Sequence, residues 1–256
     1  MAESITLLPH QQDALASLRK HKAYALWDEV GAGKTYPILY RMLDMLLADR
    51  RKWIVIAEVH LLDQWKEEIE RVCGDLGITS GIITGSSTRG ERAVMIARTP
   101  DVIITNYEYF PRLEEWLIQY AARGEIAGIV CDEAHRMMGF RGFRGGGASR
   151  AKSIVKEAHV HMGTDKEILR YMASGSPVVN PNSAQVWGLY YFLDPSIFGN
   201  VLWKYEQEFF YNVTSGQPFQ KLVMRPHMRA EMSRRMYLIA RRVMLKDLDI
   251  ELPEKR

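Results

Sequence analysis

The sequence contains a stretch whose residue types suit the binding of nucleotide phosphates. DEVGAGKT (28–35) nearly matches the phosphate-loop pattern G-x-x-x-x-G-K-[ST], but Asp28 stands where that pattern has its first glycine. Glycines allow backbone N–H groups to approach phosphate oxygens, the Lys34 ammonium can bind the β- and γ-phosphates, and the Thr35 hydroxyl can ligate Mg²⁺. The candidate nucleotide-binding residues of this stretch are Gly31, Ala32, Gly33, Lys34 and Thr35.

A second stretch supplies carboxylates. GIVCDEAH (128–135) places Asp132 at the end of an apolar run, followed by Glu133. Asp132 can hold Mg²⁺ opposite the phosphate loop, and Glu133 can polarise an attacking water as a general base. A lone Asp-Glu pair after a strand is more often a solvated turn, but its combination with the loop favours nucleotide hydrolysis. We therefore expect a nucleotide and Mg²⁺ at this site, with Lys34, Asp132 and Glu133 catalytic and with Thr35 and Asp132 as metal ligands.

The elements around these stretches predict an α/β fold. Six short runs rich in β-branched and aromatic residues alternate with longer amphipathic stretches, and they are 23–27, 53–57, 81–84, 101–105, 128–132 and 170–174. Near-continuous apolar strands separated by helices indicate a parallel sheet covered by helices on both faces. After residue 180 the alternation stops, so we expect one domain over 1–180 and a mostly helical extension over 181–256.

Composition argues against a membrane-spanning protein and against a secreted, disulfide-rich one. The 256 residues are 47% hydrophobic and 25% charged, which is ordinary for a globular protein, and no apolar run approaches 18 residues. Two cysteines, without a C-x-x-C pair or a secretory signal, indicate a reducing compartment. The net charge of +3 says little about partners, and the Lys/Arg excess after residue 220 favours a solvated face over a nucleic-acid surface.

Several motifs in order give the sequence a family resemblance. The DEAH stretch and DEVGAGKT resemble those of superfamily 2 helicases and translocases, and the acidic start of the loop is similar to that of the Swi/Snf-like branch. Further segments resemble motifs of this branch in the same order, namely LLPHQQDAL (7–15), VIAEVHLLDQWKEEI (55–69), DVIITNYEYF (101–110), the stretch 172–199 that contains SGSP, and RRVMLKDLDIELPEKR (241–256). The resemblance implies a RecA-like P-loop fold and a DNA-dependent ATPase.

The resemblance also implies roles for individual residues. Gln11 would read the adenine edge of ATP. The residues expected to grip the phosphate backbone of one nucleic-acid strand are His60, Gln64, Thr105 and Asn106. The residues expected to couple the two sites are His135, Ser174, Gly175 and Ser176. Glu58 and His60 depart from the family pattern, which usually has proline and serine at these two positions. Trp65 lies in an amphipathic pattern and is expected to pack in the core.

These enzymes use a second RecA-like lobe with an arginine finger, and residues 180–256 contain no G-R-x-x-R motif. We therefore expect an isolated first lobe that binds ATP–Mg²⁺ weakly, hydrolyses it very slowly and has no membrane partner. Its expected location is the cytoplasm of a bacterial or phage-infected cell, or the nucleus if the source is eukaryotic. Three alternatives stay open: a strand-separating DNA or RNA helicase lobe, a non-catalytic nucleic-acid-binding module and, far less favoured, a small-molecule kinase.

Overall fold

The computed structural model describes residues 5–88, 100–136, 168–175, 186–213 and 222–248. Its strands are β1 (Ala23–Leu26), β2 (Lys52–Ala57), β3 (Ser80–Ile83), β4 (Val102–Asn106), β5 (Ile126–Asp132), β6 (Leu169–Ala173), β7 (Phe210–Asn212), β8 (Leu222–Met224) and β9 (Ala240–Arg241). Its α-helices are α1 (Pro9–Lys20), α2 (Thr35–Asp49), α3 (Leu62–Cys73), α5 (Glu114–Ala122), α7 (Val186–Leu193), α8 (Leu202–Phe209) and α9 (Arg229–Met236). No helix among these residues is long and apolar enough to cross a membrane.

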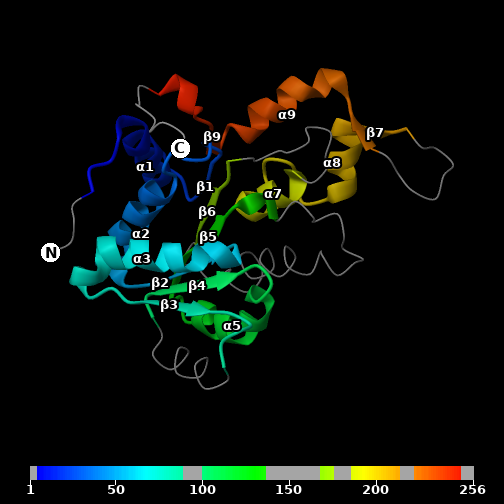
Figure 1. The fold of residues 1–256 in the computed structure, drawn as a ribbon. Coiled ribbons are helices and arrows are strands. Elements are labelled where there is room, and N and C mark those ends of the chain that lie inside the picture. Colours follow the sequence, from blue (N-terminus) through cyan, green and yellow to red (C-terminus); the bar gives the residue numbers. More distant parts are fainter. Residues whose placement is uncertain (1–4, 89–99, 137–167, 176–185, 214–221, 249–256) are drawn as a thin grey trace.

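Seven of the strands form one parallel sheet in the order β3-β4-β2-β5-β6-β1-β9 (Figure 1). The six strands expected from the sequence are all present, each within two residues of its predicted bounds. Leu26, Ala173 and Asp132 are aligned across β1, β6 and β5, so these strands end at the same edge. Residues that follow these strands therefore meet there, as expected for ligand sites of open parallel sheets.

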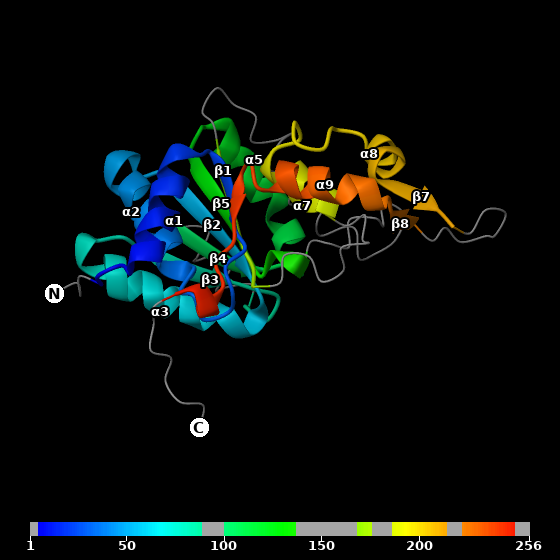
Figure 2. The same ribbon diagram turned by 90° about the horizontal axis from the view of Figure 1, so that it is seen from above.

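Helices cover both faces of the sheet, as predicted. α1, α2 and α3 lie on one face, and α5 and α7 lie on the other (Figures 1 and 2). Alternate residues of each strand serve the two cores: Val55 and Val130 pack with α1–α3, whereas Ile54 and Ile129 pack with α5 and α7. Because parallel strands buried on both faces need apolar residues at every position, these runs are continuous in the sequence.

Gly128 of β5 makes room for a large indole. A Cβ added there would lie only 2.4 Å from the Trp53 ring, and Trp53 is fully buried. The Trp53 indole N–H has no hydrogen-bond partner among the described residues. The glycine is thus required by packing rather than by backbone conformation.

The part after α7 extends away from the sheet (Figure 2). α8, α9 and the antiparallel pair β7–β8 share an aromatic core with α7, which includes Tyr190, Phe198, Tyr205 and Phe209. The chain then returns to the main sheet, because β9 pairs in parallel with β1. The division at residue 180 stays a prediction, and the structure adds that residues 240–241 supply an edge strand of the sheet.

Candidate nucleotide site

The loop after β1 turns sharply through two glycines. Gly31 has φ +89° and Gly33 has φ +70°, conformations that favour glycine, whereas Asp28 has no positive φ. α2 begins at Thr35, so its unpaired N–H groups and the positive end of its dipole face the same space. The loop therefore has the backbone of a phosphate site without a glycine at position 28.

The acidic pair at the start of the loop points away from that space. Asp28 is 2% exposed, and its Oδ1 lies 3.3 Å from Arg241 Nε. The Glu29 carboxylate accepts the backbone N–H of Leu245 at 2.8 Å. Both carboxylates thus bind the returning C-terminal segment, and neither lines the cavity described next, so they do not oppose phosphate there.

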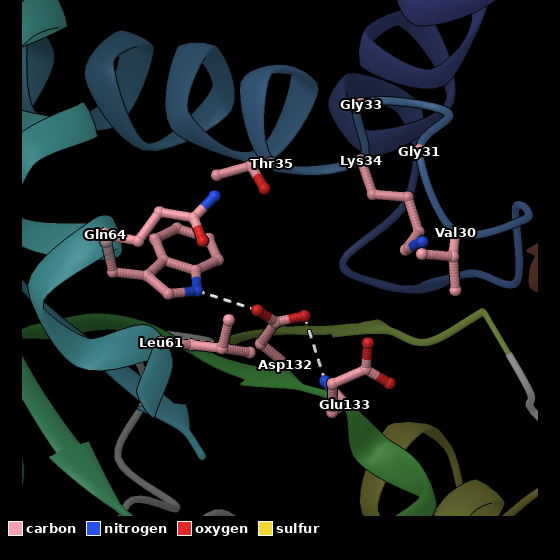
Figure 3. A pocket seen from close by; sticks show the side chains of 10 residues that line it. Val30, Gly31, Gly33, Lys34, Thr35, Leu61, Gln64, Asp132 and Glu133 are labelled. Atoms are coloured by element: carbon pink, nitrogen blue, oxygen red, sulfur yellow. Dashed lines mark hydrogen bonds between the residues drawn. The ribbon is translucent and has the colours of Figure 1, made fainter. Parts of the chain in front are cut away.

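The loop and the DEAH stretch line one cavity of about 260 Å³. Its walls are Val30, Gly31, Gly33, Lys34, Thr35, Leu61, Gln64, Trp65, Asp132 and Glu133. Figure 3 shows Lys34 and Thr35 entering from the loop and α2, and Asp132 and Glu133 facing them from the end of β5. The structure thus brings together all four candidate catalytic and metal-binding side chains.

Lys34 is held by its own loop. Its ammonium donates to the backbone carbonyls of Asp28 at 3.0 Å and Glu29 at 3.2 Å. Burial lowers the pKa of Lys34, and the carboxylates of Glu133, Asp132 and Asp28 partly counter this effect. Among the described residues its hydrogen bonds go to these neutral carbonyls, so the ammonium of this half-buried side chain is well suited to bind an incoming phosphate.

Asp132 is fixed by donors on two sides. Its Oδ2 accepts the indole N–H of Trp65 at 2.8 Å, and its Oδ1 accepts the backbone N–H of Glu133 at 2.9 Å (Figure 3). The Tyr107 hydroxyl donates to its carbonyl oxygen at 2.6 Å. Burial raises the pKa of Asp132, and the Trp65 hydrogen bond opposes that rise. A partly buried, oriented carboxylate with lone pairs to spare fits Mg²⁺.

Glu133 is held in an uncommon backbone conformation. Its φ is +47°, in the left-handed region that non-glycine residues rarely occupy. Its Oε2 accepts the Ser174 hydroxyl at 3.2 Å and lies 3.1 Å from Nδ1 of His135. Such strain, stabilised by specific partners, marks functional positions and supports Glu133 as the candidate general base.

Ser174 and Gly175, which follow β6, contact both halves of the site. Ser174 reaches Glu133 and His135, the latter at 3.2 Å. A Cβ added at Gly175 would lie 2.4 Å from Val30 Cγ2, so the segment touches the phosphate loop as well. This results from strand order, because β6 lies between β1 and β5. Ser176 lies outside the described residues.

The sequence matches the family model of the SNF2-related domain over residues 10–256. The chain belongs to this family. It is similar to transcription regulatory protein SNF2 of Saccharomyces cerevisiae, with 26% identity over 243 residues that cover 90% of this chain and 13% of the relative. Chromodomain-helicase-DNA-binding protein 1-like of Danio rerio is 27% identical over 209 residues, which cover 76% of this chain and 18% of the relative. The chain spans less than a fifth of either relative.

Solved structures confirm the RecA-like fold. The Sulfolobus solfataricus SWI2/SNF2 ATPase core in complex with dsDNA matches with a TM-score of 0.65 and 18% identity, over 94% of this chain and 45% of that chain. The UvsW helicase from bacteriophage T4 matches with a TM-score of 0.54 and 15% identity, over 74% and 58%. With the family match, these likenesses make the chain a first RecA-like lobe of the Swi/Snf-like branch, as its motifs predicted.

Gln11 of this SNF2-related domain supports the phosphate loop. Its side chain accepts the backbone N–H of Leu8 at 2.9 Å and donates to the carbonyl of Gly33 at 3.2 Å. A ring nitrogen of His10 lies 2.9 Å from the carbonyl oxygen of Ala32. Gln11 does not line the cavity of 260 Å³, so its contact with adenine stays a prediction.

The residues expected to contact nucleic acid differ in exposure and in location within the SNF2-related domain. His60 is exposed in the turn η1 (Val59–Leu61), whereas Gln64 lines the nucleotide cavity. Thr105 is fully buried and donates its hydroxyl to the Ile83 carbonyl at 2.8 Å. Asn106 is 6% exposed and donates to Glu108 at 2.8 Å. The nucleic-acid contacts of these four residues stay predictions. His60 is the most exposed of the four side chains.

The unusual Glu58 of the SNF2-related domain joins this region to the nucleotide site. Its Oε1 accepts Arg136 Nε at 2.7 Å and lies 3.9 Å from His135 Nε2, and its Oε2 lies 3.5 Å from His60 Nδ1. His135 in turn contacts Glu133. The two departures from the family pattern at positions 58 and 60 are therefore in contact with each other.

The charged residues of the site were predictable from the sequence, but the residues that position them were not. Trp65 is buried as expected, yet its indole N–H also orients Asp132. The pattern that placed Trp65 in the core could not show where its ring nitrogen points. Arg241 was also missed, although it begins a stretch that resembles a family motif.

Proposed function

We propose that this chain is the ATP-binding motor lobe of a nucleic-acid-dependent ATPase that translocates on double-stranded DNA together with a second RecA-like lobe. The observation that carries the proposal is the single cavity in which Lys34 and Thr35 face Asp132 and Glu133. Family membership supports an ATPase of this class. The similar SWI2/SNF2 ATPase core of Sulfolobus solfataricus was solved in complex with dsDNA, which supports the duplex as partner.

The residues present fit ATP and Mg²⁺. Positive φ at Gly31 and Gly33 and the start of α2 turn N–H groups toward a phosphate, and the Lys34 ammonium lies beside them. Thr35 and Asp132 would hold Mg²⁺, which when bound neutralises charge on phosphate oxygens. Glu133, held by Ser174 and close to His135, would accept a proton from the attacking water.

The cavity contains no arginine among the described residues that line it. An arginine that stabilises charge on the transferring phosphoryl group typically contributes about 10³–10⁵ in rate. We therefore infer that this residue comes from a second lobe, and that this chain alone binds ATP–Mg²⁺ but hydrolyses it very slowly.

The test is nucleotide affinity measured by calorimetry with ATPγS and Mg²⁺. Lys34→Ala should abolish binding, because Lys34 supplies the one ammonium among the described residues that line the cavity. Lys66→Ala is the matched control: Lys66 lies on α3, pairs with Glu70 at 3.7 Å and does not line the cavity. Unchanged affinity in the Lys34 variant would refute the assignment of the loop and favour a non-catalytic binding module.

Duplex binding is tested separately by fluorescence anisotropy. Contacts to phosphates carry no base code, so two unrelated duplexes of equal length should bind within about twofold of each other and more weakly as salt rises. Strand separation by a protein that carries both lobes would instead support the helicase alternative.

A further inference from the structure

The phosphate loop is supported by a segment more than 200 residues later in the chain. Residues 239–245, called here the support segment, run alongside β1 and the loop. The backbone N–H groups of Ala25, Trp27 and Glu29 donate to the carbonyls of Ile239, Arg241 and Val243, each at 2.9 Å. This alternating ladder continues the β1–β9 pairing beyond the end of β1 and into the loop.

Side chains strengthen the same contact. The Arg241 guanidinium contacts the Asp28 carboxylate at 3.3 Å and donates to the His10 carbonyl at 2.8 Å. The Asp28 side chain is 3% exposed and that of Arg241 is 14% exposed. The Glu29 carboxylate accepts the Leu245 N–H at 2.8 Å. Asp28, which stands where the common loop has its first glycine, and the adjacent Glu29 thus serve as the attachment point of the support segment.

Lys34 connects these attachments to the nucleotide. Its ammonium donates to the carbonyls of Asp28 and Glu29, the two residues that hold the support segment. A phosphate would compete for that ammonium, because charge-assisted hydrogen bonds are stronger than those to neutral carbonyls. When Lys34 turns toward a phosphate, its electrostatic attraction to the Asp28 carboxylate weakens, and Arg241, which contacts that carboxylate at 3.3 Å, should pair with it more tightly.

We propose that the support segment senses nucleotide through Lys34, and that Arg241 and Glu29 are positioning residues for the phosphate loop. The proposal rests on the proposed function, since it needs a nucleotide in the cavity. Binding of nucleotide would hold residues 241–245 more firmly against the loop, and loss of the support segment's contacts would weaken nucleotide binding by the same factor, because coupling between two sites is reciprocal.

The first experiment measures amide hydrogen exchange in the wild-type chain with and without ATPγS and Mg²⁺. The Leu245 N–H, bonded to Glu29, should exchange at least about threefold more slowly with nucleotide. A purely structural support would be protected equally in both conditions. Calorimetry on the same sample shows whether nucleotide is bound.

The second experiment compares variants by their affinity for ATPγS. Arg241→Met keeps the aliphatic stem and removes the charge, and it should weaken binding about tenfold. Arg242→Met is the matched control, because Arg242 is exposed and its guanidinium contacts Met244 rather than the loop. Glu29→Ala removes the other attachment and should weaken binding in the same direction, which keeps the test open if the Arg241 variant does not fold.

The outcomes separate the two proposals. Normal nucleotide binding with unchanged exchange at residues 241–245, or equal affinities for the Arg241 and Arg242 variants, would overturn this inference alone. A wild-type chain that binds no nucleotide would overturn the proposed function together with the inference.

Discussion

Replacement of Trp65 by phenylalanine tests how the indole N–H of Trp65 stabilises the carboxylate of Asp132. The substitution removes the indole N–H that donates to Asp132 Oδ2 at 2.8 Å and leaves an aromatic ring in the same buried place. A hydrogen bond to a charged group contributes roughly 1.5–3 kcal/mol. We therefore expect Trp65→Phe to lower the free energy of unfolding by about 2 kcal/mol at neutral pH, beyond the loss from reduced packing.

The hydrogen-bond part of this loss should depend on pH in a defined direction. Burial already raises the pKa of Asp132 above its ordinary 3.8, and removal of the Trp65 donor raises it further. Asp132 thus has a higher pKa in the variant than in the wild type. Above the variant's pKa the carboxylate is charged in both proteins, and the stabilisation by Trp65 is fully present. It is lost as the pH falls through the lower pKa of Asp132 in the wild type. Acidification should bring the two proteins closer in stability.

The assay is urea unfolding followed by circular dichroism, from pH 8 down to the lowest pH at which the chain stays folded. Trp53→Phe is the matched control, since Trp53 is also buried but its indole N–H has no partner within the described residues. Its destabilisation should not vary with pH. Equal pH dependence in the two variants would refute the role given to the Trp65 hydrogen bond.

Three further predictions concern single groups. Glu133→Gln should lower the residual ATP turnover about 10²–10⁴-fold with ATPγS affinity kept, and undiminished turnover would exclude Glu133 as general base. Gly128→Ala should destabilise the fold by about 1–3 kcal/mol in thermal unfolding, because its Cβ would lie 2.4 Å from Trp53. Gly74→Ala is the control and should be nearly neutral, because its Cβ would meet no described atom within 4 Å. Burial raises the pKa of Cys73 to about 11, which leaves little reactive thiolate at pH 8. Alkylation of Cys73 at pH 8 should therefore be about a hundredfold slower in the folded chain than in urea, and similar rates would contradict its burial.

The sequence predicted the parts of this molecule that local patterns determine. Six apolar runs became the strands β1–β6, because strands that are covered on both faces need apolar residues along their length. Lys34 and Asp132 were found because Lys34 lies in the loop after β1 and Asp132 is the last residue of β5, and the carboxyl ends of parallel strands meet at one edge of the sheet.

What the sequence did not show depends on contacts between distant residues. β9 is two residues long, too short to have a pattern of its own, and only its pairing with β1 makes it a strand. The direction of the Trp65 ring nitrogen and the partners of Asp28 are likewise set by tertiary packing. Gln64, whose contact with nucleic acid stays a prediction, lies on the first turn of α3 and lines the nucleotide cavity, a position that the sequence pattern did not show.

The return of β9 to the edge of β1 has a consequence for how the chain folds during synthesis. Arg241 is 213 residues from Asp28 and 231 residues from His10 along the sequence. Contacts of such separation close late, because the entropy of a long loop must be overcome before they form. The strands β1–β6 can assemble as they leave the ribosome, but the phosphate loop keeps an unpaired edge until residues 239–245 have been made. Completion of the nucleotide site is therefore expected to be a late step of folding, after residues 239–245 have been translated.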